Sequence, residues 1–372
     1  MEKTKVCCVF NYNPLYRLPI YSRMAKELDC DFFFGDTVFQ KIRSFDADEL
    51  PGFQGFIKAR RTKFKGFIWH SGIKRIFSRK YSHYIITGDS YAFVNWILLL
   101  YAVLTRKKVF LWTHGLHAPV TGRIHRLFER LFYTIPYGIF LYGEYALPYM
   151  KEIGCKEERL YVIHNSLDTD VIDTIYSRTV ESSIYRDYFG NDNPVLLYIG
   201  RIQKRKRLDL LLQAMAILKE QGIAMNLVVI GNPEDDDSLP TQVDALHLEN
   251  AVWFYGACYE ESKNAELIYN ADVCVCPSEI GLTCIHVLSY GLPVVTNDDF
   301  YNQMPEYEAI IPDVTGSFFK VGDAEDLSQH IVKWINLDSE GREILRTKAR
   351  EHIHKEWSVD YQISIIREAL NK

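Results

Sequence analysis

The segment from Cys274 to Thr296 constrains the fold of this chain more than any other. It reads CVCPSEIGLTCIHVLSYGLPVVT. The pattern predicts a buried strand that ends at Cys276, a helix opened by Gly281 and a second strand entered at Pro293, with apolar residues at helical spacing between the two strands. Strands separated by a helix are the unit of a parallel sheet with right-handed crossovers.

The turn before the predicted helix is suited to an anion. The first backbone N–H groups of a helix have no partner inside it, and the positive end of the helix dipole lies at the same place. A turn that feeds such a terminus is a ready-made phosphate site. This segment therefore predicts nucleotide chemistry.

A second segment, VLLYIGRIQKRKRLDLLLQAMAI over residues 195–217, has the same organisation. A buried strand over Val195–Ile199 is followed by a turn at Gly200 and by a helix. The turn carries five cations: Arg201, Lys204, Arg205, Lys206 and Arg207. Fixed cations at the carboxyl edge of a parallel sheet are suited to a pyrophosphate.

These two segments carry a family resemblance. Gly200-Arg201 followed by Lys206 resembles the G-R-L-x-x-x-K signature of the retaining GT-B glycosyltransferases of family 4, the glycosyl transferases group 1. The block from Gly281-Leu282 to Gly291-Leu292-Pro293-Val294-Val295 resembles their E-G-F-G-L-P-x-x-E-A-x-x-x-G-x-P-V-V motif. The resemblance covers most of the C-terminal half and the N-terminal half loosely. It implies an α/β chain of the GT-B class, with two Rossmann-like domains facing across a cleft.

The resemblance also implies a reaction. It predicts an enzyme that moves a hexosyl group, with retention, from a nucleotide-diphosphate sugar to a hydroxyl of a saccharide acceptor. Fold-level analogy extends this to a lipid-linked acceptor in bacterial capsule, O-antigen or exopolysaccharide synthesis. Neither a metal nor a cofactor is expected, because cations and backbone amides would stabilise the departing diphosphate.

Site residues follow from the motif positions. The expected catalytic residues are Arg201, Lys206, His114 and Glu279. The expected donor-binding residues are Gly200, Arg201, Lys206, Gly231, Tyr255, Gly281, Leu282, Thr283 and His286.

The chain departs from the family motif at its two glutamates. Counted back from Gly291, they should fall at positions occupied by Ser278 and His286, with Glu279 next to the first. In the family, the first glutamate contacts the donor sugar and the second holds the ribose. Glu279 can take the first role with a shift of one residue. His286 can still bind a ribose hydroxyl, since a neutral imidazole both donates and accepts.

Polar residues at the ends of N-terminal strands form the other half of the predicted site. His114 follows an apolar strand, at the position where GT-B relatives place a histidine on the donor sugar. The expected acceptor-binding residues are Tyr12, Arg17 and His117. The groups Tyr142-Gly143-Glu144 and His164-Asn165-Ser166 also end strands, and Gln303 and Glu306 follow a later one. The groups at 142–144 and 164–166 are otherwise explained as turns with capping polar side chains. Gln303 and Glu306 are expected near donor or acceptor hydroxyls.

A length of 372 residues favours two domains. We expect an acceptor-binding domain over 1–168, joined by a last helix at about 357–372 that packs back on it, and a nucleotide-sugar-binding domain over 169–356. The linker is expected near 166–172. The eight cysteines mostly lie in apolar strand patterns without a CxxC pair, which favours buried thiols in a cytosolic protein.

Charge is divided unevenly along the chain. Residues 1–168 hold 25 Lys and Arg against 15 Asp and Glu. Residues 58–80 are basic, with aromatic and aliphatic residues interleaved and no acid. Such a segment predicts contact with an anionic membrane surface. A solvated face is the alternative, and a nucleic-acid partner is not expected because no nucleic-acid-binding signature accompanies the segment.

Two further expectations concern location. Met1–Lys5 leads directly into a strand, so no secretory signal is expected. The apolar run Tyr91–Leu104 is too short to span a bilayer and is expected to be a buried helix between strands. The predicted location is cytoplasmic, at the inner face of the cytoplasmic membrane.

Other functions were weighed against glycosyl transfer. A GT-B sugar-nucleotide epimerase or phosphorylase shares the fold, and product analysis would separate these enzymes. A noncatalytic sugar-nucleotide-binding subunit is compatible with the altered glutamate, and donor hydrolysis by the purified chain would argue against it. A nicotinamide dehydrogenase is disfavoured, because no G-x-G-x-x-G follows a predicted strand.

Overall fold

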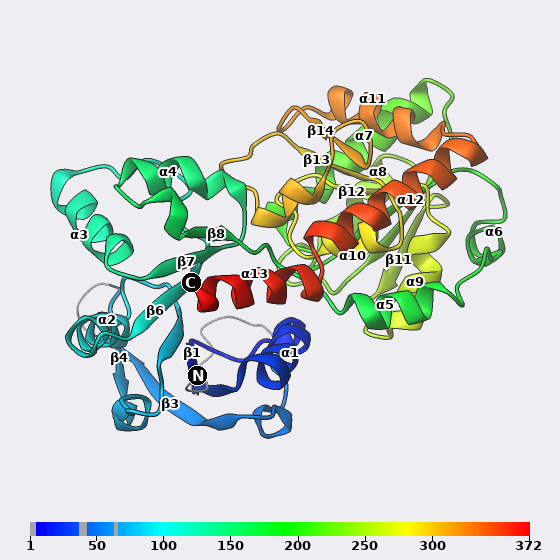
Figure 1. Cartoon of the computed structure of the whole chain (residues 1–372). Coiled ribbons are helices and arrows are strands. Elements are labelled where there is room, and N and C mark those ends of the chain that lie inside the picture. The colour runs from blue at the N-terminus through cyan, green and yellow to red at the C-terminus, as the bar shows by residue number, and fades with distance from the viewer. Residues whose placement is uncertain (1–4, 37–42, 63–65) are drawn as a thin grey trace. The chain divides into compact units, whose positions relative to one another are not determined.

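The chain divides into two compact units (Figure 1). The computed structural model describes residues 5–36, 43–62 and 66–372. Unit 1 comprises Met1–Leu167 and Ser358–Lys372, and unit 2 comprises Asp168–Trp357. Met1–Thr4, on which the expectation of a missing secretory signal depends, lie outside the described residues.

Unit 1 is built on an eight-stranded sheet in the order β4-β3-β2-β1-β5-β6-β7-β8. All neighbouring strands are parallel except β3 and β4, which are antiparallel. The strands are β1 (Val6–Phe10), β2 (Cys30–Gly35), β3 (Phe53–Arg61), β4 (Ile68–Ser71), β5 (His83–Thr87), β6 (Lys108–Thr113), β7 (Gly138–Leu141) and β8 (Leu160–Val162).

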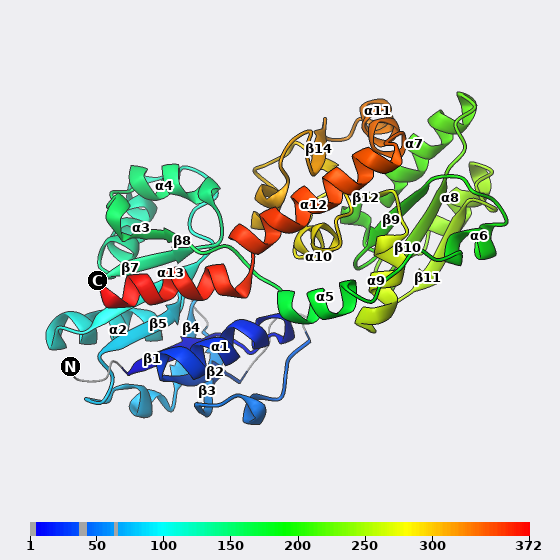
Figure 2. The same cartoon turned by 45° about the vertical axis from the view of Figure 1, so that its right-hand side comes forward.

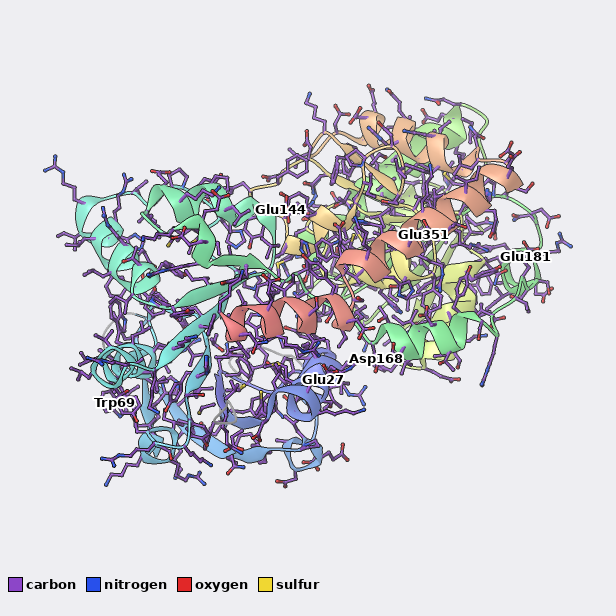
Figure 3. The ribbon with its side chains drawn as sticks, in the orientation of Figure 1. Glu27, Trp69, Glu144, Asp168, Glu181 and Glu351 are labelled. Carbon is purple, nitrogen blue, oxygen red and sulfur yellow. The ribbon has the colours of Figure 1, made fainter. Side chains whose placement is uncertain are left out.

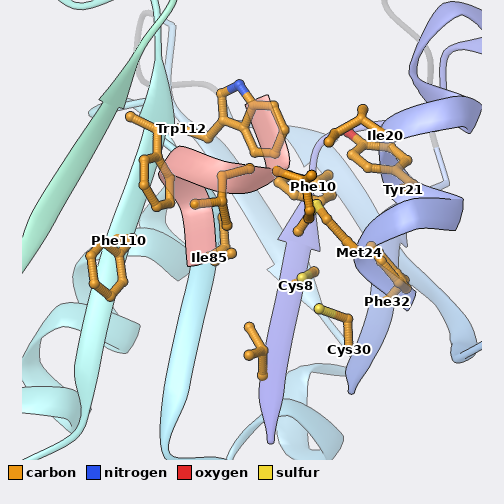
Figure 4. Packing of buried hydrophobic residues seen from close by; sticks show 14 of the residues in the cluster. Cys8, Phe10, Ile20, Tyr21, Met24, Cys30, Phe32, Ile85, Phe110 and Trp112 are labelled. Carbon is orange, nitrogen blue, oxygen red and sulfur yellow. The ribbon is translucent and has the colours of Figure 1, made fainter. Parts of the chain in front are cut away.

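Helices cover both faces of this sheet, because its strands are apolar on both sides. Side chains alternate along β1, so Cys8 joins the core under α1 (Leu18–Leu28) and α13 (Val359–Asn371). Cys7 joins the core under α2 (Phe93–Thr105), α3 (Arg123–Thr134) and α4 (Leu147–Glu152). The first core is rich in aromatic rings, and Phe10 stacks on Tyr21 with centroids 4.8 Å apart (Figure 4).

The last helix of the chain belongs to unit 1, where α13 lies alongside α1 (Figure 2). Its Gln362 is buried and makes two hydrogen bonds: Nε2 donates to the backbone oxygen of His164, and Oε1 accepts from Ser166 Oγ at 2.8 Å. The chain thus returns from unit 2 to complete the core of unit 1.

Unit 2 has a six-stranded parallel sheet in the order β11-β10-β9-β12-β13-β14. Its strands are β9 (Val195–Ile199), β10 (Asn226–Ile230), β11 (Val252–Gly256), β12 (Val273–Cys276), β13 (Val294–Asn297) and β14 (Gly316–Phe319). Its helices are α5 (Thr169–Tyr176), α6 (Ile184–Phe189), α7 (Leu208–Glu220), α8 (Leu239–Ala245), α9 (Glu261–Tyr269), α10 (Thr283–Ser289), α11 (Ala324–Ile335) and α12 (Ser339–Glu356). The predicted strands over 195–199 and 273–276 are confirmed.

The basic segment 58–80 contributes the end of β3 and all of β4, with basic side chains on the exposed positions of β3; residues 63–65 lie outside the described part. One expectation about local structure is wrong. The run Tyr91–Leu104 forms α2, but this helix is not buried all round, since Leu104 is 73% exposed.

Within the described residues, no helix is long and apolar enough to cross a membrane.

Candidate functional site

The strand order of unit 2 places a crevice between β9 and β12. The chain runs outward from β9 to β10 and β11, and returns to the other side of β9 with β12. Ligands of open α/β sheets bind at such a switch point, outside the carboxyl ends of the strands. A hollow of about 340 Å³ lies there. It is lined by Tyr198, Ile199, Gly200, Arg201, Lys206, Cys276, Ser278, Glu279, Ile280, Gly281, Leu282 and Thr283. Of the predicted catalytic and donor-binding residues, seven line this one hollow: Gly200, Arg201, Lys206, Glu279, Gly281, Leu282 and Thr283.

Lys206 is the most enclosed cation of the hollow, with its side chain 17% exposed. Its Nζ donates to the backbone oxygen of Glu279 at 2.7 Å and lies 3.2 Å from that residue's carboxylate. Burial, with the positive charges of Arg205 and Arg201, lowers the pKa of Lys206 to about 8. An incoming anion would favour the charged form of this amine.

Glu279 lies at the centre of the cations. Its carboxylate accepts hydrogen bonds from Arg205 and from Ser278 Oγ, the latter at 2.7 Å. The sequence placed Arg205 in the cationic loop but not in the site. The structure shows that Arg205 is a direct partner of Glu279, so this carboxylate is held in place before any ligand binds.

Arg201 is more exposed than Lys206. Half of its side chain is accessible, and its nearest carboxylate oxygen, on Glu234, is 3.9 Å away. The backbone oxygen of Arg201 accepts a hydrogen bond from Tyr198 OH at 2.8 Å, which fixes the turn after β9. The guanidinium is therefore free to move while its backbone is held.

Leu282 and Thr283 lead into α10 from the floor of the hollow. The Thr283 hydroxyl donates to the backbone oxygen of Ile199 at 3.2 Å, which ties the start of α10 to the end of β9. A Cβ added to Gly281 would meet other atoms only at 3.9 Å or beyond. The hollow beside Gly281 is therefore open space that a ligand can use.

Gly231 has a structural reason to be glycine. A Cβ at this position would lie 1.9 Å from the backbone oxygen of Gly200. The turn after β9 crosses directly over Gly231, and Ile202 N–H donates to the backbone oxygen of Asn232 at 3.0 Å. The absence of a side chain thus allows the cationic turn to take its position; Gly231 does not line the hollow.

His286 lies on α10 beyond the hollow and binds a carboxylate that the sequence did not single out. Its Nε2 is 2.7 Å from Glu261 Oε1, and Tyr290 OH donates to the same oxygen at 2.7 Å. Burial raises the pKa of Glu261, but hydrogen bonds from His286 and Tyr290 outweigh it and hold the pKa below its usual value. A carboxylate from α9 therefore lies against the His286 ring, next to the position where the family motif has its second glutamate.

Tyr255, at the end of β11, is not among the residues that line the hollow. Its ring packs against Trp253 with centroids 5.0 Å apart.

In unit 1, three predicted residues gather at the carboxyl ends of β1, β6 and β7. The His114 ring packs on Tyr142 at 4.5 Å and faces His117 at 6.0 Å. The Arg17 guanidinium lies over the Tyr142 ring at 5.2 Å. Burial, with the charges of His117 and Arg17, lowers the pKa of His114 to about 3. His114 is therefore a neutral imidazole, able to donate and accept hydrogen bonds.

Tyr12 lines a separate cavity of about 170 Å³ at the switch point of unit 1, between β1 and β5. The walls are mostly apolar; besides Tyr12, the polar lining residues are Asn11, His70, Thr87, Asp89 and Asn95. Burial raises the pKa of Tyr12 to about 12, which keeps its hydroxyl protonated. His70 was not singled out from the sequence, because β4 was not predicted. Asp89, which follows β5, was not singled out either.

Residues from two of the other predicted groups make hydrogen bonds that stabilise the fold. Gln303 is buried; its Oε1 accepts from Ile280 N–H at 2.9 Å and its Nε2 donates to Thr296 Oγ1 at 3.1 Å, so it braces the loop under the hollow. His164 and Ser166 hold α13 through Gln362. Glu306 is buried close to Gly281.

Across residues 5–36, 43–62 and 66–372, no three His, Cys, Asp or Glu side chains gather as a metal site would need.

Comparison with known proteins finds a family match for part of the chain. Residues 186–352 match the family model for Glycosyl transferases group 1. This match covers most of unit 2 and includes both motifs on which the resemblance was based.

Curated relatives match over part of their length. The chain is similar to the capsular polysaccharide biosynthesis glycosyltransferase CapM of Staphylococcus aureus, with 26% identity over 45% of this chain and 43% of CapM. It is 23% identical to the putative colanic acid biosynthesis glycosyltransferase WcaL of Escherichia coli K12, over 59% of this chain and 54% of WcaL. The chain thus spans about half the length of these relatives.

Solved structures match over nearly the whole chain. HepE of Anabaena, solved in complex with UDP, superposes with a TM-score of 0.72 at 14% identity, over 99% of this chain and 100% of HepE. Another structure of HepE holds UDP-glucose and has a TM-score of 0.68. This likeness shows the fold, and the predicted GT-B class with two Rossmann-like units is confirmed.

Proposed function

We propose that the protein is a retaining glycosyltransferase that uses a nucleotide-diphosphate sugar as donor. The observation that carries this proposal is the hollow between β9 and β12, where Lys206 and Arg201 lie beside the entry to α10. The family match over unit 2 supports the class of enzyme. The UDP and UDP-glucose bound by HepE support the class of donor and make UDP the first nucleotide to test.

In the proposed reaction, negative charge develops on the β-phosphate as the nucleoside diphosphate leaves. Lys206 stabilises this charge from an enclosed position, where a charge interaction is screened less than at the surface. Arg201 reaches the same group from the rim of the hollow. The acceptor hydroxyl attacks the face that the leaving group vacates, and its proton passes to the departing phosphate oxygen. Two cations supply the charge that a divalent metal would otherwise supply, so no metal is required.

We assign the ribose to the pair formed by His286 and Glu261. The resemblance requires a carboxylate at position 286, and the structure supplies one from α9 against the His286 ring. Hydrogen bonds from His286 and Tyr290 keep this carboxylate ionised and oriented. A carboxylate has acceptor capacity beyond these bonds, and a ribose hydroxyl is a donor that suits it.

The acceptor is proposed to bind unit 1. Tyr12, Arg17 and His117 offer hydroxyl, guanidinium and imidazole groups to a saccharide, and the neutral His114 can bond a hydroxyl of the donor sugar. The similarity to CapM and WcaL favours a hexosyl transfer in bacterial surface-polysaccharide synthesis, with a lipid-linked saccharide as acceptor, in the cytoplasm at the inner face of the membrane.

Incubation of the purified protein with UDP-glucose, UDP-galactose or UDP-N-acetylglucosamine tests the proposal. Release of UDP that is stimulated by a saccharide acceptor, with the new linkage in the donor's anomeric configuration, supports it. Inversion at the anomeric carbon, or conversion of the donor sugar without transfer, contradicts it.

A further inference from the structure

Helix α2 exposes apolar side chains that a surface helix normally lacks. Its sequence, FVNWILLLYAVLT, contains no charged residue. Val94, Leu98 and Leu99 face the core, yet Leu100 and Leu104 on the other side are 61% and 73% exposed. A helix on the surface of a globular protein ordinarily places polar residues there. The outward face of α2 is therefore built to contact something other than water.

Helix α3 continues this surface. Phe132 and Tyr133 pack into the core, whereas Ile124, Leu127 and Leu131 follow one another at helical spacing and are exposed, Ile124 by 88%. The apolar side chains of α3 therefore cover more of the helix surface than the side that packs on the core.

The two apolar stripes adjoin. The Trp96 ring of α2 packs on Phe128 of α3 with centroids 5.1 Å apart. Leu100 is one turn from Trp96, and Leu131 is three residues from Phe128, so each lies on the same side of its helix as that contact. We call the surface formed by Leu100, Val103, Leu104, Ile124, Leu127 and Leu131 the α2–α3 face. Its side chains are between 47% and 88% exposed.

The α2–α3 face is bordered by positive charge. Arg123 and Arg130 are exposed on an adjoining side of α3, and the exposed Arg106 follows α2. Arg126, on the same side of α3, is paired with Glu152 at 3.3 Å, and the Lys107 amine donates to the backbone oxygen of Tyr81. The one acid of α3, Glu129, is buried, and its Oε1 accepts from Ser90 Oγ at 3.0 Å. A basic rim around an apolar surface is complementary to anionic lipid headgroups over acyl chains.

The same charges disfavour a second copy of the chain as the occupant. In a two-fold interface the same surface of each copy meets the other, so the arginines of the two rims would be brought together. Trp69, next to α2, supports a lipid surface. Its side chain is labelled in Figure 3 and is 50% exposed. Its ring lies 5.9 Å from that of Phe93 at the start of the helix. Tryptophan is favoured where one end of the ring is apolar and the other wet.

We propose that the α2–α3 face docks on a bilayer that contains anionic phospholipid. The contact then runs through two helices and differs from the one expected over 58–80. The first turn of α2 also lines the cavity that holds Tyr12, so docking would bring a lipid-linked saccharide to that cavity. This last step rests on the proposed function, whereas the docking itself does not.

Flotation of the purified chain with vesicles tests the docking. Wild-type protein should float with vesicles of mixed phosphatidylcholine and phosphatidylglycerol, and much less with phosphatidylcholine alone. Leu104→Ser/Ile124→Ser should lower the partition coefficient for mixed vesicles at least about tenfold. The matched control is Val180→Ser/Ile344→Ser in unit 2, whose side chains are 69% and 49% exposed. It should bind as wild type.

Variants that remove charge distinguish attraction to the lipid headgroups from apolar contact with the acyl chains. Arg123→Gln/Arg130→Gln should weaken flotation with mixed vesicles at low salt, because exposed charges are screened as salt rises. Arg178→Gln, an exposed arginine of unit 2, is the control. An unchanged Tm and circular dichroism spectrum in every variant would show that both units are folded, and unchanged UDP affinity would show that the donor site in unit 2 is intact. A docking failure is then distinguishable from a failure of the proposed function.

Three results would overturn the docking. The first is wild-type protein that does not float with anionic vesicles. The second is flotation that Leu104→Ser/Ile124→Ser leaves intact. The third is a wild-type dimer, measured by light scattering, that this double variant converts to a monomer without any effect on vesicle binding.

Discussion

Replacement of Lys206 by methionine should weaken nucleotide binding more than any other single loss of charge in its loop. Methionine keeps the apolar stem of the side chain and removes only the amine. Because the Lys206 side chain is 17% exposed, its interaction with a phosphate is a charge-assisted hydrogen bond of about 1.5–3 kcal/mol. This corresponds to a rise in the Kd for UDP of roughly 10- to 150-fold. For turnover we expect a loss of about 2–4 kcal/mol of barrier.

Isothermal titration calorimetry with UDP measures the binding effect. Lys204→Met is the matched control, since Lys204 is an exposed cation of the same loop whose backbone N–H, not its side chain, bonds Asp235. Arg201→Ala should have a smaller effect, because half of the Arg201 side chain is exposed. If Lys206→Met binds UDP no more weakly than Lys204→Met does, the proposed role of Lys206 is refuted.

The pH dependence of the same binding gives an independent test. The pKa of Lys206 is lowered to about 8 in the free protein, and only the protonated amine attracts the diphosphate. Affinity should therefore be complete below pH 8 and fall as the pH rises through it. Lys206→Arg should remove this fall, since arginine stays charged throughout the range. A wild-type affinity that is flat from about pH 7 to 9 would contradict the lowered pKa.

Three further predictions concern other parts of the site. Glu261→Gln should lower affinity for UDP about tenfold, but leave the affinity for its 2′,3′-dideoxy analogue almost unchanged; equal losses for both would show that Glu261 does not hold the ribose. Gly231→Ala should lower the free energy of unfolding by about 1–3 kcal/mol, because the new Cβ would lie 1.9 Å from the Gly200 oxygen. Gly281→Ala should instead keep the Tm and weaken UDP binding. Denaturant unfolding measures the loss of stability, and calorimetry measures the loss of affinity. Transfer activity should persist in excess EDTA, and its loss with recovery on adding Mg²⁺ would contradict catalysis by cations alone.

The strands of both sheets were predictable from the sequence where they are buried on both faces. The predicted strand over Val195–Ile199 is an apolar run, and the structure has the same bounds. β3 was missed because only one of its faces is covered: Ile57 and Ala59 are buried, while Lys58 and Arg60 alternate with them on the exposed side. Its charge content then suggested a surface segment.

The exposure of the outward face of α2 also could not be predicted from the sequence. An apolar helix without charges predicts burial all round, and composition does not reveal that one side lacks a covering layer. That became visible only from the exposed fractions of Leu100, Val103 and Leu104.

Donor-site residues that lie in short sequence motifs were predictable from the sequence. Gly200, Lys206 and Gly281 follow strands at fixed spacing, and the structure brings them to one hollow. Glu261 could not be found in this way, because it reaches His286 from another helix, 25 residues away in the chain. Gly231 was assigned to the ligand, but it is required by the approach of the Gly200 backbone.

A crystal structure of the complex with UDP tests the central claim most directly. We predict the diphosphate in the hollow between β9 and β12, with a β-phosphate oxygen at about 2.7–3.2 Å from Lys206 Nζ and the ribose hydroxyls next to the carboxylate of Glu261. A nucleotide that binds elsewhere on the chain, with Lys206 still bonded only to Glu279, would contradict the account.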